Sequence, residues 1–367
     1  MENRRCAART LWSLSALISC ALCSFASESP LPKAVATLVF SEMSSPTQGE
    51  FTWTTVAFVT ETSVAVGRCR QDCSSKQSSL ILVRSKEGDL RPSEQTQWFD
   101  SDLAIHPTSG GQILAGHDWL TTTVVYSADL STVRDLSRHL SRFSASGRTV
   151  GEQARGSWKL YRLTDGLEPL REGAGDLRSV SDEVVVIQNG KAITAETIDG
   201  KRLGSFSLSD DVLGLHARLL GNSKLLLPDC RNTVAVVDFA GKRQLNIRQP
   251  GLCGLRDTTS STDGRRILFD FVAHKTSGLR HMLENIQAIP SFGMVGPEDF
   301  NREEVRVLDT VTGKSCFDWH RTFPMTYSQI RSAAISPSGG FVAIAVGNTL
   351  SLYQLPLVCK GGTRSPQ

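Results

Sequence analysis

Short apolar runs separated by glycine-containing turns recur along most of the chain. One kind of turn is a small polar cluster that ends in glycine, as in "STDGR" from Ser261 and "SPSGG" from Ser336. A second kind follows an alternating strand, as in "TIDGKRL" from Thr197 and "DTVTGKS" from Asp309. The runs between the turns are rich in Val, Ile, Leu and aromatic residues, which is typical of strands, and glycine accommodates the positive φ of tight hairpins. The pattern therefore predicts an all-β protein built from hairpins.

The strands group into units of roughly forty residues, a period that indicates a repeat architecture. Six units have room for four strands and the last has room for three. Near the N-terminus, Lys33–Phe40 reads as an isolated strand, which we expect to pair with Thr349–Leu355 and complete the last unit. The predicted fold is a seven-bladed β-propeller of four-stranded antiparallel blades, its ring closed by the N-terminal strand, because closure leaves no long unpaired edge. The units begin near Thr54, Ser101, Ser141, Asp176, Val212, Gly254 and Gln329.

Two stretches carry a family resemblance. "AAISPSGGFVAIAVGNTLSLYQL", from Ala333, and "VRVLDTVTGKSCFDW", from Val305, resemble blades of bacterial seven-bladed β-propellers of the WD-repeat-like superfamily. The Gly-His and Trp-Asp dipeptides of true WD repeats are absent from the expected blade positions. The resemblance therefore implies the shared architecture and no particular partner. Such propellers mostly serve as binding platforms, and some are enzymes, so the fold alone does not decide the function.

The beginning of the chain differs from the rest. Three arginines precede an apolar stretch, Leu11–Phe25, and small residues follow where a signal peptidase would cut. This pattern predicts a secretory signal peptide over residues 1–26, followed by a single propeller domain over 27–359 and a disordered tail over 360–367. The alternative is a bacterial lipobox in which Cys20 carries a lipid anchor. The expected location is therefore secreted or periplasmic, with a membrane-anchored lipoprotein as the alternative.

Composition narrows the class of partner. The chain has 367 residues, of which 40% are hydrophobic and 21% charged, as in folded proteins with a substantial core. The formal net charge of +3 is small and the basic residues form no long run, which argues against a nucleic-acid partner. No apolar run after the leader is long enough to span a membrane.

Six of the nine cysteines lie beyond the leader, and an even number after an export signal favours disulfides over buried free thiols, the alternative. In a propeller blade, the loops between consecutive blades lie at the same end as the loops between the second and third strands. The other two kinds of turn lie at the opposite end. Assigning each cysteine to an end by this rule predicts three bridges: Cys230–Cys253, Cys316–Cys359 and Cys69–Cys73.

Candidate chemistry is sparse. "VTGKS", from Val311, lacks the first glycine of a phosphate-binding loop and precedes no helix, so we interpret it as a hairpin turn. Four predicted inner strands begin with acidic residues, and a ring of carboxylates could hold Ca²⁺, although Asp also favours turns. Lactonase-like propeller enzymes use such a central metal. The candidate metal ligands are Asp102, Asp176, Asp211 and Asp257.

The sixth unit contains a long insert, expected over 275–303. Long loops of this kind are uncommon unless they have a function or are disordered. Its apolar and cationic residues either pack on the propeller or contact a partner, and the candidate binding residues are Arg280, His281, Phe292 and Phe300.

Together these observations favour an exported, non-enzymatic β-propeller that binds a protein or a glycan and needs no cofactor. Two alternatives stay open. One is a metal-dependent, lactonase-like hydrolase with its site at the central channel. The other is an envelope-anchored structural lipoprotein.

Overall fold

The structure is a computed structural model, and the chain divides after Pro32 into two units, Met1–Pro32 and Lys33–Gln367. Everything described below belongs to the second unit. The residues that the structure describes are 32–40, 51–71, 76–86, 88–99, 103–106, 112–117, 122–127, 129–131, 133–136, 138, 140–208, 217–228, 233–248, 255–275, 300–324, 329–330 and 332–359.

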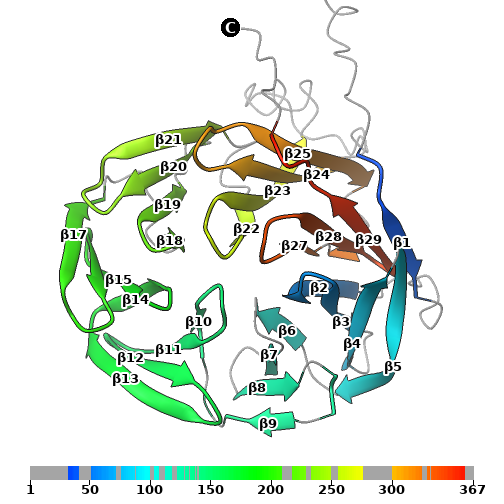
Figure 1. The fold of residues 1–367 in the computed structure, drawn as a ribbon, viewed down its shortest axis with the longest axis horizontal. Helices are drawn as coiled ribbons and strands as arrows, with labels where there is room; N and C mark the ends of the chain where they lie inside the picture. The colour runs from blue at the N-terminus through cyan, green and yellow to red at the C-terminus, as the bar shows by residue number, and fades with distance from the viewer. Residues whose placement is uncertain are drawn as a thin grey trace, which may run out of the picture. The chain divides into compact units, whose positions relative to one another are not determined.

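The second unit is all-β, as the turn pattern predicted, and its strands form six four-stranded sheets and one five-stranded sheet (Figure 1). Sheet 1 has the order β26 (Gln329–Ile330), β2 (Phe51–Thr60), β3 (Ser63–Gln71), β4 (Lys76–Lys86), β5 (Asp89–Phe99). Sheet 2 contains β6 (Leu103–His106), β7 (Gln112–His117), β8 (Thr122–Ser127) and β9 (Val133–Asp135). Sheet 3 contains β10 (Arg142–Phe143), β11 (Thr149–Ala154), β12 (Ser157–Leu163) and β13 (Leu167–Ala174).

Sheets 4 to 6 follow the same order of strands, and sheet 7 differs in its outer strand. Sheet 4 contains β14 (Asp176–Val180), β15 (Val184–Asn189), β16 (Ala192–Thr197) and β17 (Arg202–Ser207). Sheet 5 contains β18 (Arg218–Leu220), β19 (Lys224–Pro228), β20 (Thr233–Asp238) and β21 (Arg243–Arg248). Sheet 6 contains β22 (Leu255–Ser260), β23 (Arg266–Lys275), β24 (Phe300–Asp309) and β25 (Ser315–Pro324). Sheet 7 has the order β27 (Ser332–Ile335), β28 (Phe341–Val346), β29 (Thr349–Gln354), β1 (Ala36–Val39).

Sheet 7 combines strands from both ends of the described chain. β1 pairs antiparallel with β29, with Ala36 opposite Leu352 and Val39 opposite Thr349. The backbone N–H of Phe40 extends the pairing by donating to the carbonyl of Asn348 at 2.9 Å. The segment that the sequence marked as an isolated strand is thus the outer strand of the last sheet.

Consecutive sheets share apolar cores. One cluster joins sheet 4 to sheet 5 through Val186 and Leu225, and another joins sheet 5 to sheet 6 through Val236 and Phe269. Equivalent clusters join sheets 1 and 2, 3 and 4, and 6 and 7. A further cluster contains Phe40, from the segment after β1, together with residues of sheets 1 and 7. Burying a large apolar side chain contributes roughly 1.5–3 kcal/mol, so these repeated contacts hold each sheet against its neighbours.

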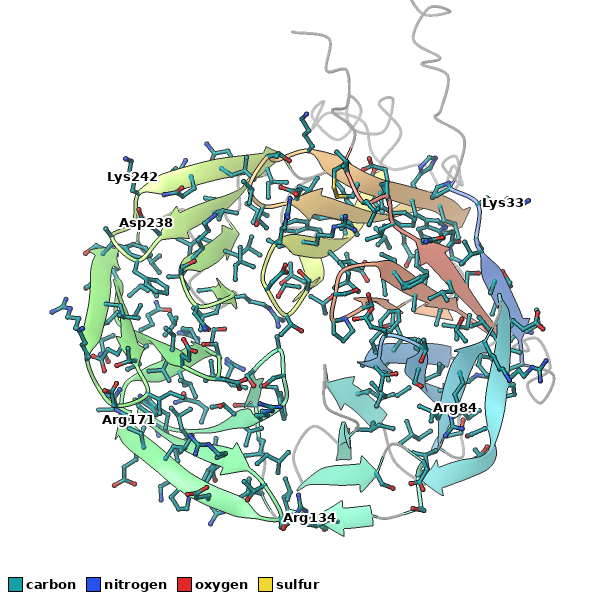
Figure 2. The ribbon with its side chains drawn as sticks, in the orientation of Figure 1. Lys33, Arg84, Arg134, Arg171, Asp238 and Lys242 are labelled. Carbon is teal, nitrogen blue, oxygen red and sulfur yellow. A yellow bond between two sulfur atoms is a disulfide. The ribbon has the colours of Figure 1, made fainter. Side chains whose placement is uncertain are left out.

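Polar links reinforce the outer strands (Figure 2). Arg134 of sheet 2 donates from Nη2 to the carbonyl of Thr164, at 3.0 Å, in the hairpin of sheet 3. Arg171 of sheet 3 lies over the ring of Trp158 and donates to the Glu196 carboxylate of sheet 4 at 2.5 Å. An arginine is well suited to such a link, because its planar group can stack and donate at once.

The polar turns that end in glycine connect neighbouring sheets at one end. Ser261 and Ser336 are buried and stand first in their turns, and each side-chain oxygen accepts from the N–H five residues later. Gly264 has a φ of +66°, and a Cβ there would lie 2.6 Å from the backbone nitrogen of Gly221 in sheet 5. Glycine is therefore required at this position both by conformation and by the approach of the next turn.

A disulfide joins Cys316, in β25, to Cys359, which follows β29, with the two Cα atoms 4.3 Å apart. This agrees with one of the three pairings predicted from strand direction. Cys73, Cys230 and Cys253 lie outside the described residues. Only the backbone of Cys69, in β3, is described.

The strands around the predicted insert are longer than expected. Lys275 ends β23 opposite Phe300, and Glu303 lies within β24 opposite Val272. The predicted insert, 275–303, thus overlaps strand residues at both of its ends. The structure accommodates Glu303 in a strand because this fully buried residue accepts from Nη2 of Arg321 in β25 at 2.9 Å. The predicted insert therefore shortens to 276–299, which lies outside the described residues.

Candidate functional site

Of the four acids proposed as metal ligands, only Asp176 has a side chain that the structure describes. Asp176 begins β14, and its carboxylate accepts from Nη2 of Arg178 at 2.9 Å. Asp257 lies in β22, where only its backbone is described, and Asp102 and Asp211 lie outside the described residues. Within the described part of the chain, no group of three or more His, Cys, Asp or Glu residues could hold a metal ion.

The proposed binding residues of the insert can be placed only in part. Arg280, His281 and Phe292 lie outside the described residues. Phe300 is the first residue of β24 and lies opposite Pro324 of β25, and its side chain is not described.

Among the described residues, no helix is long and apolar enough to cross a membrane.

A different group of side chains gathers at the first strands of sheets 3, 4 and 5. The group consists of three arginines: Arg142 in β10, Arg178 in β14 and Arg218 in β18. Each of these strands is the edge strand of its sheet, β10 contacts β14, and β14 contacts β18. Figure 1 shows the three strands on the sides of their sheets that point toward the middle of the view.

A β-bulge places Arg178. The register between β14 and β15 shifts between Leu177 and Ser179, so Arg178 is the extra residue of the bulge. Gln153 of sheet 3 fixes this backbone, because its Oε1 accepts from the N–H of Leu177 at 2.6 Å. Bulges commonly redirect a side chain out of the regular alternation of a strand. The bulge therefore determines where this guanidinium points.

Two acceptors hold the Arg178 side chain, which is 10% exposed. Nε donates to Oε1 of Gln188 at 2.7 Å, and Nη2 donates to Asp176 at 2.9 Å. The Asp176 side chain is 51% exposed, so this ion pair is open to solvent on the side of the carboxylate. Its main effect is to orient the guanidinium, since exposed ion pairs contribute little to stability.

Arg142 is held by backbone carbonyls. Its Nε donates to the carbonyl of Leu177 at 3.0 Å and its Nη1 to that of Ser141 at 2.7 Å. Leu177 packs over Gly151, the partner of Arg142 in β11, where a Cβ would lie 2.5 Å from the leucine Cδ2. The missing side chain of Gly151 thus lets β14 approach close enough for Arg142 to reach it.

The positive charges of Arg178 and Arg218 affect the pKa of Arg142. Burial lowers the pKa of Arg142, and the neighbouring positive charges of Arg218 and Arg178 lower it further, against the opposing effect of Asp176. Arg218 is exposed, and its neighbour Leu219 donates its N–H to Oγ of Ser179 at 2.9 Å, which joins β18 to β14. An arginine keeps its charge under such conditions, so like charges remain close together.

The arrangement can recognise anions. Guanidinium groups present several N–H donors in a fixed plane that matches the oxygens of carboxylates and phosphates. These arginines were not among the candidate residues predicted from the sequence, which were chosen as acids able to bind a metal or as residues of the insert. A signal was present, since "SR", "LR" and "AR" occur in three successive predicted inner strands, ending at Arg142, Arg178 and Arg218. Arg256 of β22 also occupies a bulge, between Leu255 and Asp257, and its side chain is not described.

Comparison with known proteins gives the architecture and nothing finer. No protein-family model matches the chain, and no curated protein matches it. Among solved structures, the C-terminal WD40 domain of Sif2 is similar, with a TM-score of 0.50 and 12% sequence identity over 89% of this chain and 99% of that one. At this identity the likeness concerns the fold alone. The repeated four-stranded antiparallel sheets and this neighbour identify a WD40-like β-propeller.

Proposed function

We propose that the chain is an exported, seven-bladed β-propeller whose ring is closed by β1, and that it acts as a non-enzymatic binding platform for a protein partner. The pairing of β1 with β29 supports closure, because it ties the first described strand to the last sheet. The contact between sheets 7 and 1 supports it too, since Oγ of Ser338 donates to the Glu61 carboxylate at 2.7 Å.

The WD40-like architecture is the main observation that supports a role as a binding platform. A ring of short sheets leaves loops at both ends of the molecule, and binding residues concentrate on loops held by a rigid scaffold. Two observations support the finer parts of the proposal. The Cys316–Cys359 disulfide fits an oxidising compartment and hence export. The carboxylate of Asp176 accepts from Arg178, which argues against a calcium-dependent hydrolase at that position.

A photo-crosslinking experiment tests the platform role. A photoreactive residue is placed at the exposed Thr262 or Val311, in turns at one end of sheet 6, and at Arg243 on the outer strand of sheet 5 as the control. In cells that produce the full chain, we expect one discrete crosslinked product from a turn position and none from Arg243. Sequencing the recovered N-terminus in the same samples tests export: a start at residue 27 supports it, and lipid on Cys20 supports the anchored form. Absence of a discrete product from the turns, or an intact Met1, would contradict the corresponding part of the proposal.

A further inference from the structure

We propose that Arg84 and Arg91 bind an oxyanion, the phosphate or carboxylate group of a small ligand, in a cavity between sheets 1 and 2. This inference goes beyond the platform role, because such a site would exist whether or not a protein docks on the molecule.

The cavity lies at one end of the interface between the two sheets. Its volume is about 600 Å³, and its lining combines residues of the sheet 1 hairpins with Asp129, from the turn between β8 and β9. Along β4, Leu80 and Leu82 belong to the apolar cluster that joins sheets 1 and 2. Alternate side chains of a strand lie on the same face, so Arg84 and Lys86 continue this row beyond the cluster, and both line the cavity.

The two arginines of the site form a like-charge pair. Arg84 in β4 and Arg91 in β5 lie directly opposite each other in the strand register. Side chains at such positions have Cβ atoms about 4.5–5.5 Å apart, and like charges there destabilise a sheet. Wherever else charged residues face each other between the third and fourth strands of the described sheets, an acidic residue faces a basic one, as Glu168 faces Arg162. An oxyanion bound between Arg84 and Arg91 would replace their repulsion with attraction.

The described carboxylates on sheet 1 leave the two guanidinium groups accessible. Oδ2 of Asp89 is 3.7 Å from Nη2 of Arg91, and both side chains are 72% exposed, so this ion pair contributes little. Arg84, labelled in Figure 2, is also exposed. Among the described residues, no carboxylate forms an ion pair with Arg84. Guanidinium N–H donors from both strands are therefore available to the oxygens of one ligand group.

The opposite wall of the cavity carries a negative charge that is fixed in place. Oδ1 of Asp129 accepts from the hydroxyls of Ser127 and Ser131, at 2.5 and 2.7 Å, and from the N–H of Ser131 at 3.1 Å. These hydrogen bonds hold the pKa of Asp129 well below its usual range, so its carboxylate is charged at neutral pH. A ligand that fits the cavity therefore places its anionic group at sheet 1 and a hydroxyl or ammonium group toward Asp129.

Calorimetric titration of the purified full chain tests the site, with inorganic phosphate and citrate as the two probes at constant ionic strength. The test variants are Arg84→Gln and Arg91→Gln. The control is Arg243→Gln, which removes the same charge from an exposed position on the outer strand of sheet 5. Charge-assisted hydrogen bonds are the strong ones, so each test variant should weaken binding about tenfold and the control less than about twofold.

Asp129→Asn should change the affinity in the opposite direction. The variant removes the negative charge of the opposite wall, while the side-chain oxygen of asparagine can still accept from Ser127 and Ser131. Neither probe carries a cationic group, so both should bind more tightly, by up to about fivefold as expected for an exposed pair of charges. Unchanged or weaker binding in this variant would overturn the placement of the anion between the two walls.

Thermal unfolding without a ligand separates a binding role from a structural one. Because like charges that face each other destabilise a sheet, Arg84→Gln and Arg91→Gln should unfold at the temperature of the wild type or above it. A marked loss of stability in both variants would show that the pair is structural and would overturn the proposal.

The two probes separate the sources of the anion, because tighter binding of phosphate points to a phosphorylated ligand and tighter binding of citrate to a polycarboxylate. Heat no larger than that of a sodium chloride titration would overturn the proposal, as would equal losses in Arg84→Gln and Arg243→Gln. Neither outcome depends on the crosslinking result, so the two proposals fail separately.

Discussion

At the scale of single residues, Asp309 shows how one side chain fixes a turn. It ends β24, and its side chain is 8% exposed. Oδ1 accepts from the N–H groups of Val311 and Thr312, at 3.0 and 2.8 Å, and from the Thr312 hydroxyl. Burial by itself raises the pKa of this carboxyl, but the hydrogen bonds from Thr312 and Val311 and that from Arg265 outweigh it, so the pKa is lowered. The "VTGKS" stretch is therefore the hairpin turn that the sequence indicated.

Replacing Asp309 with alanine should lower the free energy of unfolding by about 1–3 kcal/mol, because it leaves two N–H groups without their acceptor. A carboxyl with a lowered folded-state pKa stabilises the fold above its unfolded pKa of about 3.9, and this stabilisation is lost as the pH falls through the folded-state value. The difference between wild type and Asp309→Ala, from urea unfolding, should therefore be constant near neutral pH and shrink below about pH 4. Asp165→Ala, at an exposed hairpin position, is the control and should change little. An equal loss in both variants would show that the turn does not depend on this carboxylate.

The residue scale is also where prediction from the sequence was weakest. Asp176 is a candidate metal ligand because it begins an inner strand, and the sequence did not reveal that its carboxylate accepts a hydrogen bond from Arg178. That pairing depends on a bulge in the strand register, which is held in place by Gln153 of β11 in the neighbouring sheet. Sequence spacing assumes regular alternation, so it cannot report which way a bulged residue points.

At the scale of elements, hairpins were predictable and strand ends were not. Turn signals located the hairpins around Ser261 and Ser336, because a buried serine and a glycine with positive φ are locally encoded. β26 escaped prediction, since its parallel pairing with β2 depends on a partner more than 250 residues away in sequence. The extension of β24 escaped it for the same reason, because the partner that makes Glu303 acceptable in a strand is Arg321 of β25.

The Cys316–Cys359 disulfide gives a prediction at this scale. It closes a loop with a sequence separation of 43 residues and ties the segment after β29 to sheet 6. A bridge of this span stabilises by about 2–4 kcal/mol, largely by restricting the unfolded chain. Replacing both cysteines with serine should lower the unfolding midpoint accordingly, and adding reductant should lower the midpoint of the wild type by more than that of the double variant. A reductant effect of equal size in the double variant would mean that another thiol pair is responsible.

At the scale of the whole molecule, β1 covers the outer edge of β29, the strand pairing on which the proposed closure of the ring depends. Without β1, the edge of β29 would be open to pairing with another chain, which is the usual route to aggregation. The segment also supplies Phe40, which is 7% exposed and lies under the guanidinium of the buried Arg68, 4.6 Å from its ring centroid. Removal of the segment would thus open a sheet edge and a core cluster together.

Deleting Ala34–Phe40 should therefore lower the temperature of thermal unfolding, broaden the transition and cause aggregation that increases with protein concentration. Deleting residues 361–367 removes an equal number of residues from the other end and is the control, which we expect to leave the transition unchanged. A synthetic peptide of sequence Lys33–Phe40 should restore the cooperative transition of the truncated protein, because strand pairing and the Phe40 contact do not require a covalent link. Unchanged unfolding of the truncated protein would mean that the sheets hold together without β1. Failure of the peptide to rescue an aggregating protein would mean that the deletion acts elsewhere than at the edge of β29, and either result would refute closure of the ring by this strand.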